Sequence, residues 1–182
     1  MKYLVSGREM KNWEKKAMEA QKIPSLLLME RAALAVVEEL LSGKYDLKKI
    51  LIACGTGNNG GDGFAIARLM MQKGYDTHVC LVGAMDKLSV DAKHQLEMYQ
   101  AISGKFVTAP AYHEYTVIVD AIFGIGCNRD ITGIAAEVID SINETNAQVI
   151  AVDVPSGISS DTGKVCGVAV KAHATVTFFT EK

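Results

Sequence analysis

A glycine-rich segment between an apolar run and an amphipathic run constrains the fold of this chain more than any other feature. Residues 49–54 read Lys-Ile-Leu-Ile-Ala-Cys, and residues 55–63 read Gly-Thr-Gly-Asn-Asn-Gly-Gly-Asp-Gly. We expect a strand, a turn that contains five glycines and then a helix over Gly63–Lys73. Gly55, Gly57 and Gly60 match the Gly-x-Gly-x-x-Gly pattern of turns that hold a phosphate against the free N–H groups of a helix N-terminus. The segment therefore predicts a strand–turn–helix unit with a ligand at the turn.

Apolar runs of strand length alternate with amphipathic stretches along the rest of the chain. We expect strands at residues 50–53, 78–82, 105–107, 116–120, 148–153 and 174–179. We expect helices at residues 26–41, 63–73, 90–102 and 134–143, after a first helix that carries Met10, Trp13 and Ala17 at helical spacing, with Trp13 in the core. Nearly continuous apolar strands are typical of a parallel sheet that helices cover on both faces. The pattern predicts an α/β class: a three-layer α/β/α Rossmann-like fold with a mainly parallel central sheet.

Composition and charge exclude several classes of protein. Of the 182 residues, 49% are hydrophobic and 22% are charged, which is typical of a folded chain and predicts a single domain over residues 1–182. The chain ends soon after an apolar run, which leaves open whether it continues in a longer protein. Nineteen Lys and Arg residues against 21 Asp and Glu residues give a net charge of −2, so no basic field is available for nucleic acid.

Membrane association and secretion are not expected either. No apolar run approaches the roughly 18 residues of a membrane span, and the first residues lack the apolar segment of a signal peptide. Four widely spaced cysteines form no Cys-x-x-Cys pair, and they predict reduced, mostly buried thiols: Cys54, Cys80, Cys127 and Cys166. We therefore expect a cytoplasmic protein.

Two further apolar runs end in an aspartate that is followed by a glycine-bearing turn. Asp120 ends residues 117–120 and precedes Gly124, and Asp153 ends residues 149–153 and precedes a Pro-Ser-Gly sequence. The carboxyl ends of parallel strands share one edge of a sheet, so we expect one crevice lined by oxygen-bearing side chains. These side chains are Asn58, Asn59, Asp62, Asp120, Asp153 and Ser156. Their oxygens suit an alkali or alkaline-earth cation, although this chemistry alone does not require a metal.

Two common nucleotide sites fit this turn poorly. A dinucleotide-binding dehydrogenase has an acidic residue roughly 20 residues after the glycines, at the end of the second strand. That run ends here in Val82-Gly83, which disfavours an NAD-dependent oxidoreductase. A Walker loop has Gly-Lys-Ser or Gly-Lys-Thr after the glycines, and this sequence has neither.

Four motifs, in their order along the chain, resemble those of one family. They are Leu-Met-Glu-Arg-Ala at residues 28–32, the Gly57–Gly63 segment, Asp120–Gly124 and Asp153–Gly157. They resemble the YjeF N-terminal domain family, the NAD(P)H-hydrate epimerases, and the similarity covers nearly the whole chain. The resemblance implies an enzyme that interconverts the R and S forms of NAD(P)H hydrate (NADHX and NADPHX), whose nicotinamide ring is hydrated at C6. A partner, NAD(P)H-hydrate dehydratase, can then restore the cofactor; the resemblance also implies a bound potassium ion (K+) and a homodimer.

The resemblance assigns roles to residues by motif position. It implies three potassium ligands: Asn59, Asp120 and Ser156. It implies a substrate site formed by Asn58, Asn59, Gly60, Gly61, Asp62, Gly124, Ile125, Gly126, Cys127, Asn128, Arg129, Asp130 and Asp153. The chain departs from the family at Ile125, where relatives often have Thr, and at Cys127, where they often have Leu. A hydroxyl contact is thereby lost, whereas backbone N–H contacts remain.

Inversion at C6 requires proton transfer at the C6 oxygen, whether the hydroxyl leaves to give an iminium or the ring opens and closes again. Asp120 is the expected catalytic acid/base, because a strand end holds it rigidly and burial raises the pKa of a carboxyl group. A cation bound to Asp120 would instead favour its ionised form and would make Asp153 the acid, and the sequence leaves both open. The alternative function is a non-catalytic scaffold that binds nucleotide or RNA and dimerises; the near-neutral charge and both strand-end carboxylates argue against it.

Overall fold

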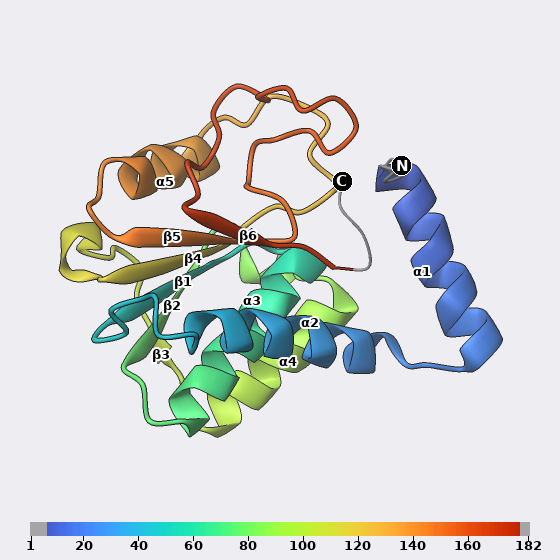
Figure 1. Cartoon of the computed structure of the whole chain (residues 1–182), viewed down its shortest axis with the longest axis horizontal. Coiled ribbons are helices and arrows are strands. Elements are labelled where there is room, and N and C mark those ends of the chain that lie inside the picture. Colours follow the sequence, from blue (N-terminus) through green and yellow to red (C-terminus); the bar gives the residue numbers. More distant parts are fainter. Residues whose placement is uncertain (1–6, 179–182) are drawn as a thin grey trace.

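The structure, a computed structural model, describes residues 7–178 and has a six-stranded sheet at its centre (Figure 1). The strands are β1 (Ile50–Cys54), β2 (Thr77–Leu81), β3 (Lys105–Phe106), β4 (Val117–Ala121), β5 (Gln148–Val152) and β6 (Ala174–Val176). They lie in the order β3-β2-β1-β4-β5-β6, and every pair of neighbours is parallel. This order confirms the predicted α/β, Rossmann-like class. The end of the strand predicted to reach residue 179 lies outside the described residues.

Helices cover both faces of this sheet (Figure 1). They are α1 (Gly7–Gln21), α2 (Ser25–Leu40), α3 (Asn58–Gln72), α4 (Val90–Ala101) and α5 (Ile134–Asn143). α2, α3 and α4 lie on one face, and α5 lies on the other. Alternate residues of β1 supply the two cores: Ile50 and Ile52 pack with residues of α2 and α3, whereas Leu51 and Ala53 pack with residues of α5.

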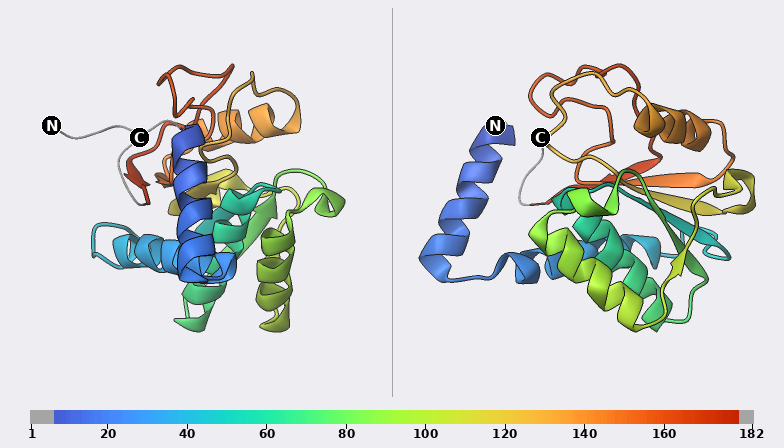
Figure 2. Two further views of the ribbon diagram at one scale, coloured as in Figure 1. Left: turned by 90° about the vertical axis from the view of Figure 1, so that its right-hand side faces the viewer. Right: turned by 180° about the vertical axis from the view of Figure 1, so that it is seen from behind.

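α1 lies away from the sheet in Figure 1 and in the right-hand view of Figure 2. The side chain of Trp13 is 54% exposed, so the prediction that Trp13 lies in the core is wrong. Helical spacing predicted the helix correctly, but spacing does not tell whether another layer lies opposite it. α1 nevertheless contributes Met18 to the wall of a cavity.

α3 begins at Asn58 rather than at the predicted Gly63, so most of the glycine-rich segment is helix. We expected a later start because glycine costs a helix about 1 kcal/mol relative to alanine. The structure shows what offsets that cost. A Cβ at Gly60 would lie 1.8 Å from the backbone oxygen of Gly55, and a Cβ at Gly63 would lie 2.7 Å from Sγ of Cys54. The missing side chains therefore let the start of α3 lie directly against β1 and the turn that follows it.

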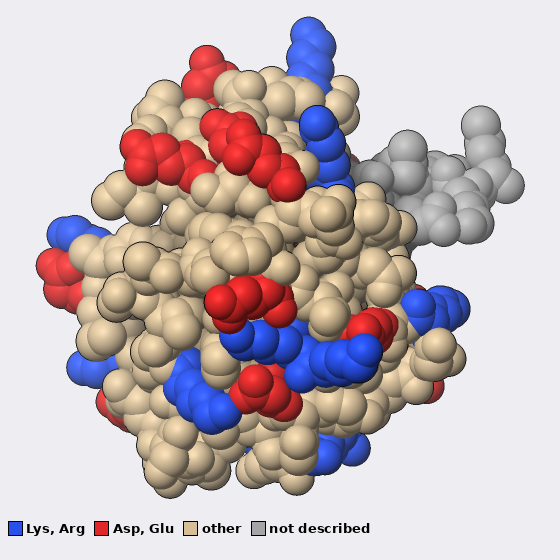
Figure 3. All heavy atoms as spheres, turned by 90° about the vertical axis from the view of Figure 1, so that its left-hand side faces the viewer, with Lys and Arg blue, Asp and Glu red and all other residues tan. Residues whose placement is uncertain are grey.

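The edge at which the strands begin carries charges of both signs (Figure 3). Lys49 pairs with Glu114 at 2.5 Å, and Lys105 pairs with Asp76 at 2.5 Å. Acidic and basic side chains are interspersed on this face, as expected from the near-neutral net charge. Within residues 7–178, no helix combines the length and the apolar character that crossing a membrane requires.

Candidate active site

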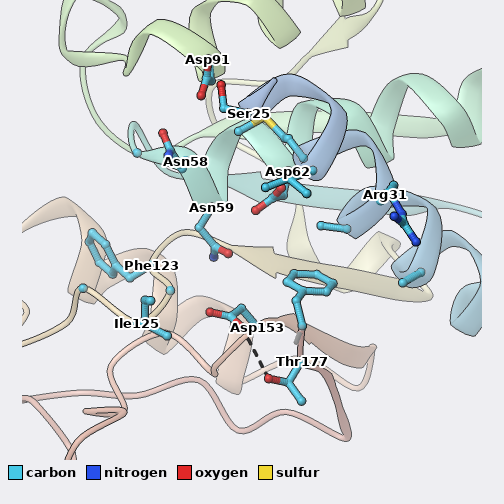
Figure 4. A pocket seen from close by; sticks show the side chains of 18 of the residues that line it. Ser25, Arg31, Asn58, Asn59, Asp62, Asp91, Phe123, Ile125, Asp153 and Thr177 are labelled. Carbon is cyan, nitrogen blue, oxygen red and sulfur yellow. Dashed lines mark hydrogen bonds between the residues drawn. The ribbon is translucent and has the colours of Figure 1, made fainter. Parts of the chain in front are cut away.

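The strand order creates a crevice between β1 and β4. The chain proceeds outward from β1 to β2 and β3 on one side, and from β4 to β5 and β6 on the other, so the connections leaving β1 and β4 diverge. A cavity of about 950 Å³ lies at the carboxyl ends of these strands (Figure 4). Its walls come from α2, the start of α3, residues 122–126 after β4, Asp153 after β5, and Thr177 and Phe178 after β6. The three loop tips that the sequence predicted to converge thus line one cavity.

The cavity has a polar side and an apolar side (Figure 4). Asn58, Asn59 and Asp62 of α3 face Asp153 across it, and Asp91 of α4 lies at its rim. The apolar side consists mainly of α2 and the residues near the C-terminal end: Leu28, Met29, Ala32, Ala35 and Phe178. Among the described lining residues, the positive charge comes from the Arg31 guanidinium of α2. An apolar wall with a few convergent polar groups is typical of sites that bind cofactor-sized molecules.

The N-terminus of α3 opens onto the cavity without a side-chain cap. Gly57 is the N-cap residue and makes no side-chain cap hydrogen bond, while the first helical bond runs from the N–H of Gly61 to its carbonyl at 3.1 Å. The preceding N–H groups of the first turn are therefore available to an anion. Asn58 is held from the side, because the hydroxyl of Ser89 donates to its Oδ1 at 2.7 Å. Ser89 is also the N-cap residue of α4, so this contact connects the start of α3 to the start of α4.

Asp120 and Ser156 form a buried pair directly behind the cavity wall. Both are 0% exposed. The Ser156 hydroxyl donates to Oδ1 of Asp120 at 2.5 Å, and the Ser156 N–H donates to Oδ2 at 2.7 Å. The same hydroxyl accepts from the N–H of Phe123 at 2.8 Å, and Phe123 is part of the wall. Burial raises the pKa of Asp120 to about 6, although its hydrogen bonds from Ser156 and Ile122 oppose this rise.

Asp153 is the strand-end carboxylate that reaches the cavity. Its backbone is left-handed, with a φ of 68°, and its N–H donates to the carbonyl of Val176 at 2.8 Å. The hydroxyl of Thr177 donates to its Oδ1 at 3.5 Å (Figure 4). An Asp in this sparsely populated region marks a position where the surrounding fold imposes the conformation. The imposed turn directs the carboxylate into the cavity instead of along the strand.

Comparison with known proteins identifies the relatives of this fold. A family model described as "YjeF-related protein N-terminus" matches residues 25–182. The chain is 42% identical over 175 residues to a protein of Oenococcus oeni named NAD(P)H-hydrate epimerase, covering 95% of this chain and 83% of that protein. Proteins with the same name from Weissella koreensis and Levilactobacillus brevis are 42% and 46% identical, covering 96% and 85% of this chain and 79% and 73% of their own lengths.

The chain belongs to the YjeF N-terminal family. The family resemblance found in the four motifs is thereby confirmed. The fold agrees as well: the crystal structure of the yeast protein ynu0 covers 99% of this chain, and 82% of its own, with a TM-score of 0.84 and 23% sequence identity.

The motif residues of this YjeF N-terminal chain fall into three groups in space. Those that line the cavity are Asn58, Asn59, Asp62, Gly124, Ile125, Gly126 and Asp153. Those buried behind it are Asp120 and Ser156, together with Gly60 and Gly61, which pack inside the start of α3. The rest of the predicted substrate segment lies beyond the lining residues: Cys127, Asn128, Arg129 and Asp130. The catalytic, substrate and metal roles of all these residues stay predictions.

Sequence reasoning missed several residues that line the cavity, including Met18, Asp91 and Thr177. The sequence analysis named Arg31 only as part of the motif at residues 28–32. Its neighbour Glu30 is the residue that indicates how this part of α2 is oriented. Glu30 forms an ion pair with Arg68 of α3, whose side chain is 8% exposed. This pair between α2 and α3 fixes the side of α2 that faces the cavity.

The site of this family member fits a cation with oxygen ligands. Nδ2 of Asn59 is buried without a hydrogen-bond partner. Rotating the side-chain amide by a half-turn would exchange Nδ2 for Oδ1, and a cation at this place would then be a partner for the amide oxygen. The Asp120 carboxylate, the Ser156 hydroxyl and the Phe123 carbonyl, 3.2 Å from that hydroxyl, are further hard oxygen donors. Residues 7–178 contain no group of three or more His, Cys, Asp or Glu side chains suited to a metal. The donors available are thus mainly neutral oxygens with one carboxylate.

Proposed function

We propose that this chain is an NAD(P)H-hydrate epimerase, an isomerase that interconverts the R and S forms of NADHX and NADPHX for nicotinamide nucleotide repair. One observation carries the proposal: relatives with this name are about 42% identical over 95% of the chain, and the motifs of the family converge on one cavity. The second function considered, a nucleotide- or RNA-binding scaffold, has no specific observation in its favour.

The cavity offers a separate place for each part of the substrate. The diphosphate is expected at the N-terminus of α3, where free N–H groups and the helix dipole favour negative charge. Arg31 supplies a further positive charge at the cavity wall. The nicotinamide ring is expected on the polar side, between Asn59 and Asp153, with the apolar face of α2 behind it. This placement brings C6 of the ring to a carboxylate.

Epimerisation requires one group that gives a proton to the C6 oxygen and takes one back. In the iminium route, the protonated hydroxyl leaves as water, and water returns to the opposite face of the ring and releases a proton. Asp153 lines the cavity in the observed conformation, so we place this proton transfer on Asp153. Asp120 remains the second candidate, because its raised pKa suits an acid/base, but its carboxyl contacts the ring only if the wall of Ile122 and Phe123 opens.

A potassium ion is the proposed cofactor, held by Asn59, Asp120 and Ser156. When bound, the ion supplies positive charge that keeps Asp120 ionised. Asp120 and Ser156 then hold the segment after β4 in place through Phe123, whose N–H binds the Ser156 hydroxyl. This role makes Asp120 necessary for the shape of the cavity even if Asp153 carries the proton.

A homodimer belongs to the proposal as well. Leu27, Leu34 and Leu41 lie seven residues apart along α2 and its C-terminal cap, and they are 51%, 46% and 38% exposed. We call these three residues the outer stripe of α2. An apolar stripe with a seven-residue repeat is the pattern by which one helix packs along another. We also propose a cytoplasmic location and coupling to an NAD(P)H-hydrate dehydratase, because epimerisation alone does not restore the cofactor.

The test uses the purified chain with a mixture of the hydrate epimers enriched in one form. We expect the two epimers to equilibrate faster than they do spontaneously. Chromatographic separation of the epimers over time measures this rate. Asp153→Asn should reduce this rate by 10²-fold or more, the usual contribution of a general acid/base. Asp86→Asn, which alters an exposed carboxylate away from the cavity, is the matched control. Equilibration no faster than without protein would refute the function, and full activity of Asp153→Asn would return the proton transfer to Asp120.

A further inference from the structure

The rim of the cavity carries a carboxylate, that of Asp91, to which neither the motifs nor the proposed function assign a role. Asp91 is the second residue of α4, is partly buried, and lines the cavity together with residues of α2 and α3. A dinucleotide site usually has an acidic residue at the end of the second strand, where this chain has Val82-Gly83. The start of the next helix therefore brings to the cavity an acidic group that the second strand lacks.

A hydrogen-bonded serine and close packing fix Asp91 beside the start of α3. The hydroxyl of Ser89 donates to Oδ1 of Asn58 at 2.7 Å and accepts from the N–H of Ala92 at 3.2 Å. A Cβ at Gly61 would lie 3.1 Å from Cα of Ala92, so α3 and α4 are in direct contact at this point. Asp91 directly precedes Ala92, and its backbone is therefore held at one position relative to the first turn of α3.

The orientation of the substrate decides which chemical group meets Asp91. A dinucleotide bound as in the proposed function, on which this step rests, carries a nucleoside on each side of its diphosphate. With the diphosphate at the start of α3 and the nicotinamide ring between Asn59 and Asp153, the adenosine half leaves the diphosphate on the opposite side. Figure 4 shows Asp91 on that side, beyond Asn58 as seen from Asp153. The ribose of the adenosine half is thus expected at Asp91.

The negative charge of Asp91 distinguishes between the two forms of this ribose. A carboxylate accepts hydrogen bonds and donates none, so it binds the free 2′- and 3′-hydroxyls of NADHX and repels the 2′-phosphate of NADPHX. Within residues 7–178, no hydrogen bond or ion pair occupies the Asp91 carboxylate, which leaves its oxygens available. Arg31, whose charge would favour a 2′-phosphate, lies on α2 well away from Asp91 in Figure 4.

We propose that Asp91 sets the nucleotide preference of this chain, because it binds the adenosine ribose of NADHX and disfavours the 2′-phosphate of NADPHX. It is a specificity-determining residue and takes no part in the proton transfer at C6. Its carboxylate has the function that an acidic residue at the end of the second strand has in other dinucleotide-binding folds, although it comes from the start of a helix.

Binding of two nucleotides that lack the nicotinamide ring tests this preference without turnover. The probes are ADP-ribose and its 2′-phosphate, and isothermal titration calorimetry measures the dissociation constant of each. We expect the unaltered chain to bind ADP-ribose roughly tenfold more tightly, or better, than its 2′-phosphate. Asp91→Asn, which keeps the shape but not the charge, should bring the two constants to within about threefold of each other, and Asp91→Lys should reverse the preference.

The matched control is Glu97→Gln, which removes one charge from an exposed residue of the same helix and should behave like the unaltered chain. Three results overturn the proposal: no binding of either nucleotide, equal binding of both by the unaltered chain, or equal effects of Glu97→Gln and Asp91→Asn on their ratio.

The epimerase assay separates this preference from the proposed function. If the chain equilibrates the epimers but Asp91→Asn leaves the ratio of kcat/KM for NADHX and NADPHX unchanged, the role of Asp91 is refuted and the function stands. If the chain does not accelerate epimerisation but Asp91→Asn changes the ratio of the two dissociation constants as expected, the function is refuted and the role of Asp91 stands.

Discussion

Asp120 makes the stability of the folded chain depend on pH, because its carboxyl group is fully buried. Burial raises its pKa from 3.8 to about 6. The stability that this group contributes is fully present below pH 3.8 and is lost as the pH rises through about 6, where the folded chain must ionise a buried acid. Relative to Asp120→Asn, we expect the free energy of unfolding to fall by roughly 1–1.5 kcal/mol between pH 5 and pH 8.

Urea titrations of both proteins in a potassium-free buffer measure this difference. Adding potassium at pH 8 should stabilise the unaltered chain but not Asp120→Asn, since a cation beside Asp120 stabilises its ionised form. The difference between the two proteins should therefore become smaller. If the two proteins lose stability in parallel over this pH range, another group is responsible.

At Asp153, the effect of the left-handed backbone on stability can be measured separately from the role of the carboxylate in catalysis. Its φ of 68° costs a residue with a β-carbon about 1–2 kcal/mol, and Asp and Asn tolerate this region better than most. We expect Asp153→Ala to lower the free energy of unfolding by about 1 kcal/mol, and Asp153→Asn to change it by less than about 0.5 kcal/mol. Both variants should lose epimerase activity. Asp153→Gly isolates the backbone: if it is as unstable as Asp153→Ala, the lost bond to Thr177 and not strain is the cause.

At the scale of elements, the closeness of α3 to β1 is the feature on which the site depends. A Cβ at Gly60 would lie 1.8 Å from the backbone oxygen of Gly55, which has no freedom to rotate away. We therefore expect Gly60→Ala to lower the free energy of unfolding by about 2 kcal/mol or more, even though alanine favours helix. Urea denaturation measures this loss.

Gly57→Ala is the matched control for α3. No atom lies within 4 Å of a Cβ at Gly57, and its φ of −86° suits any residue. The expected change is about 0.5–1 kcal/mol, from the weaker N-cap alone. Equal losses in the two alanine variants would show that helix propensity and capping, not close packing, account for the glycines.

These elements also show what local sequence can predict. The apolar periods fix α5 at Ile134–Asn143 as predicted, and β5 at Gln148–Val152 to within one residue, because both depend on short-range patterns. The start of α3 escaped prediction because its glycines are explained by Gly55, which lies against them only in the folded chain. The exposure of Trp13 escaped prediction because an apolar spacing predicts a helix but does not tell which of its side chains become buried in the fold.

At the scale of the whole molecule, the order of motifs predicted one crevice because the carboxyl ends of parallel strands share an edge. Which motif residues would reach the cavity was not predictable, since Asp120 and Asp153 look alike in sequence but point to different environments.

α2 connects the cavity to the outer surface of the molecule. One side of the helix packs in the core through residues such as Val36 and Leu40. A second side, with Leu28, Arg31 and Ala35, lines the cavity. The third side is the outer stripe, in which Leu34 is 46% exposed. A second copy packed along the outer stripe would hold the helix that forms the cavity wall.

Leu34→Glu tests this dimer, because it places a charge in the middle of the outer stripe. We expect its dimer dissociation constant to rise at least tenfold, which corresponds to about 1.4 kcal/mol, measured by sedimentation over a range of concentrations. Met85→Glu adds the same charge at a residue that is 55% exposed elsewhere and should leave the dimer intact. Equal effects of both variants, or a monomer at every concentration of the unaltered chain, would exclude the outer stripe as the interface. Because the cavity wall belongs to the same helix, epimerase activity of Leu34→Glu should fall as dilution raises the monomer fraction.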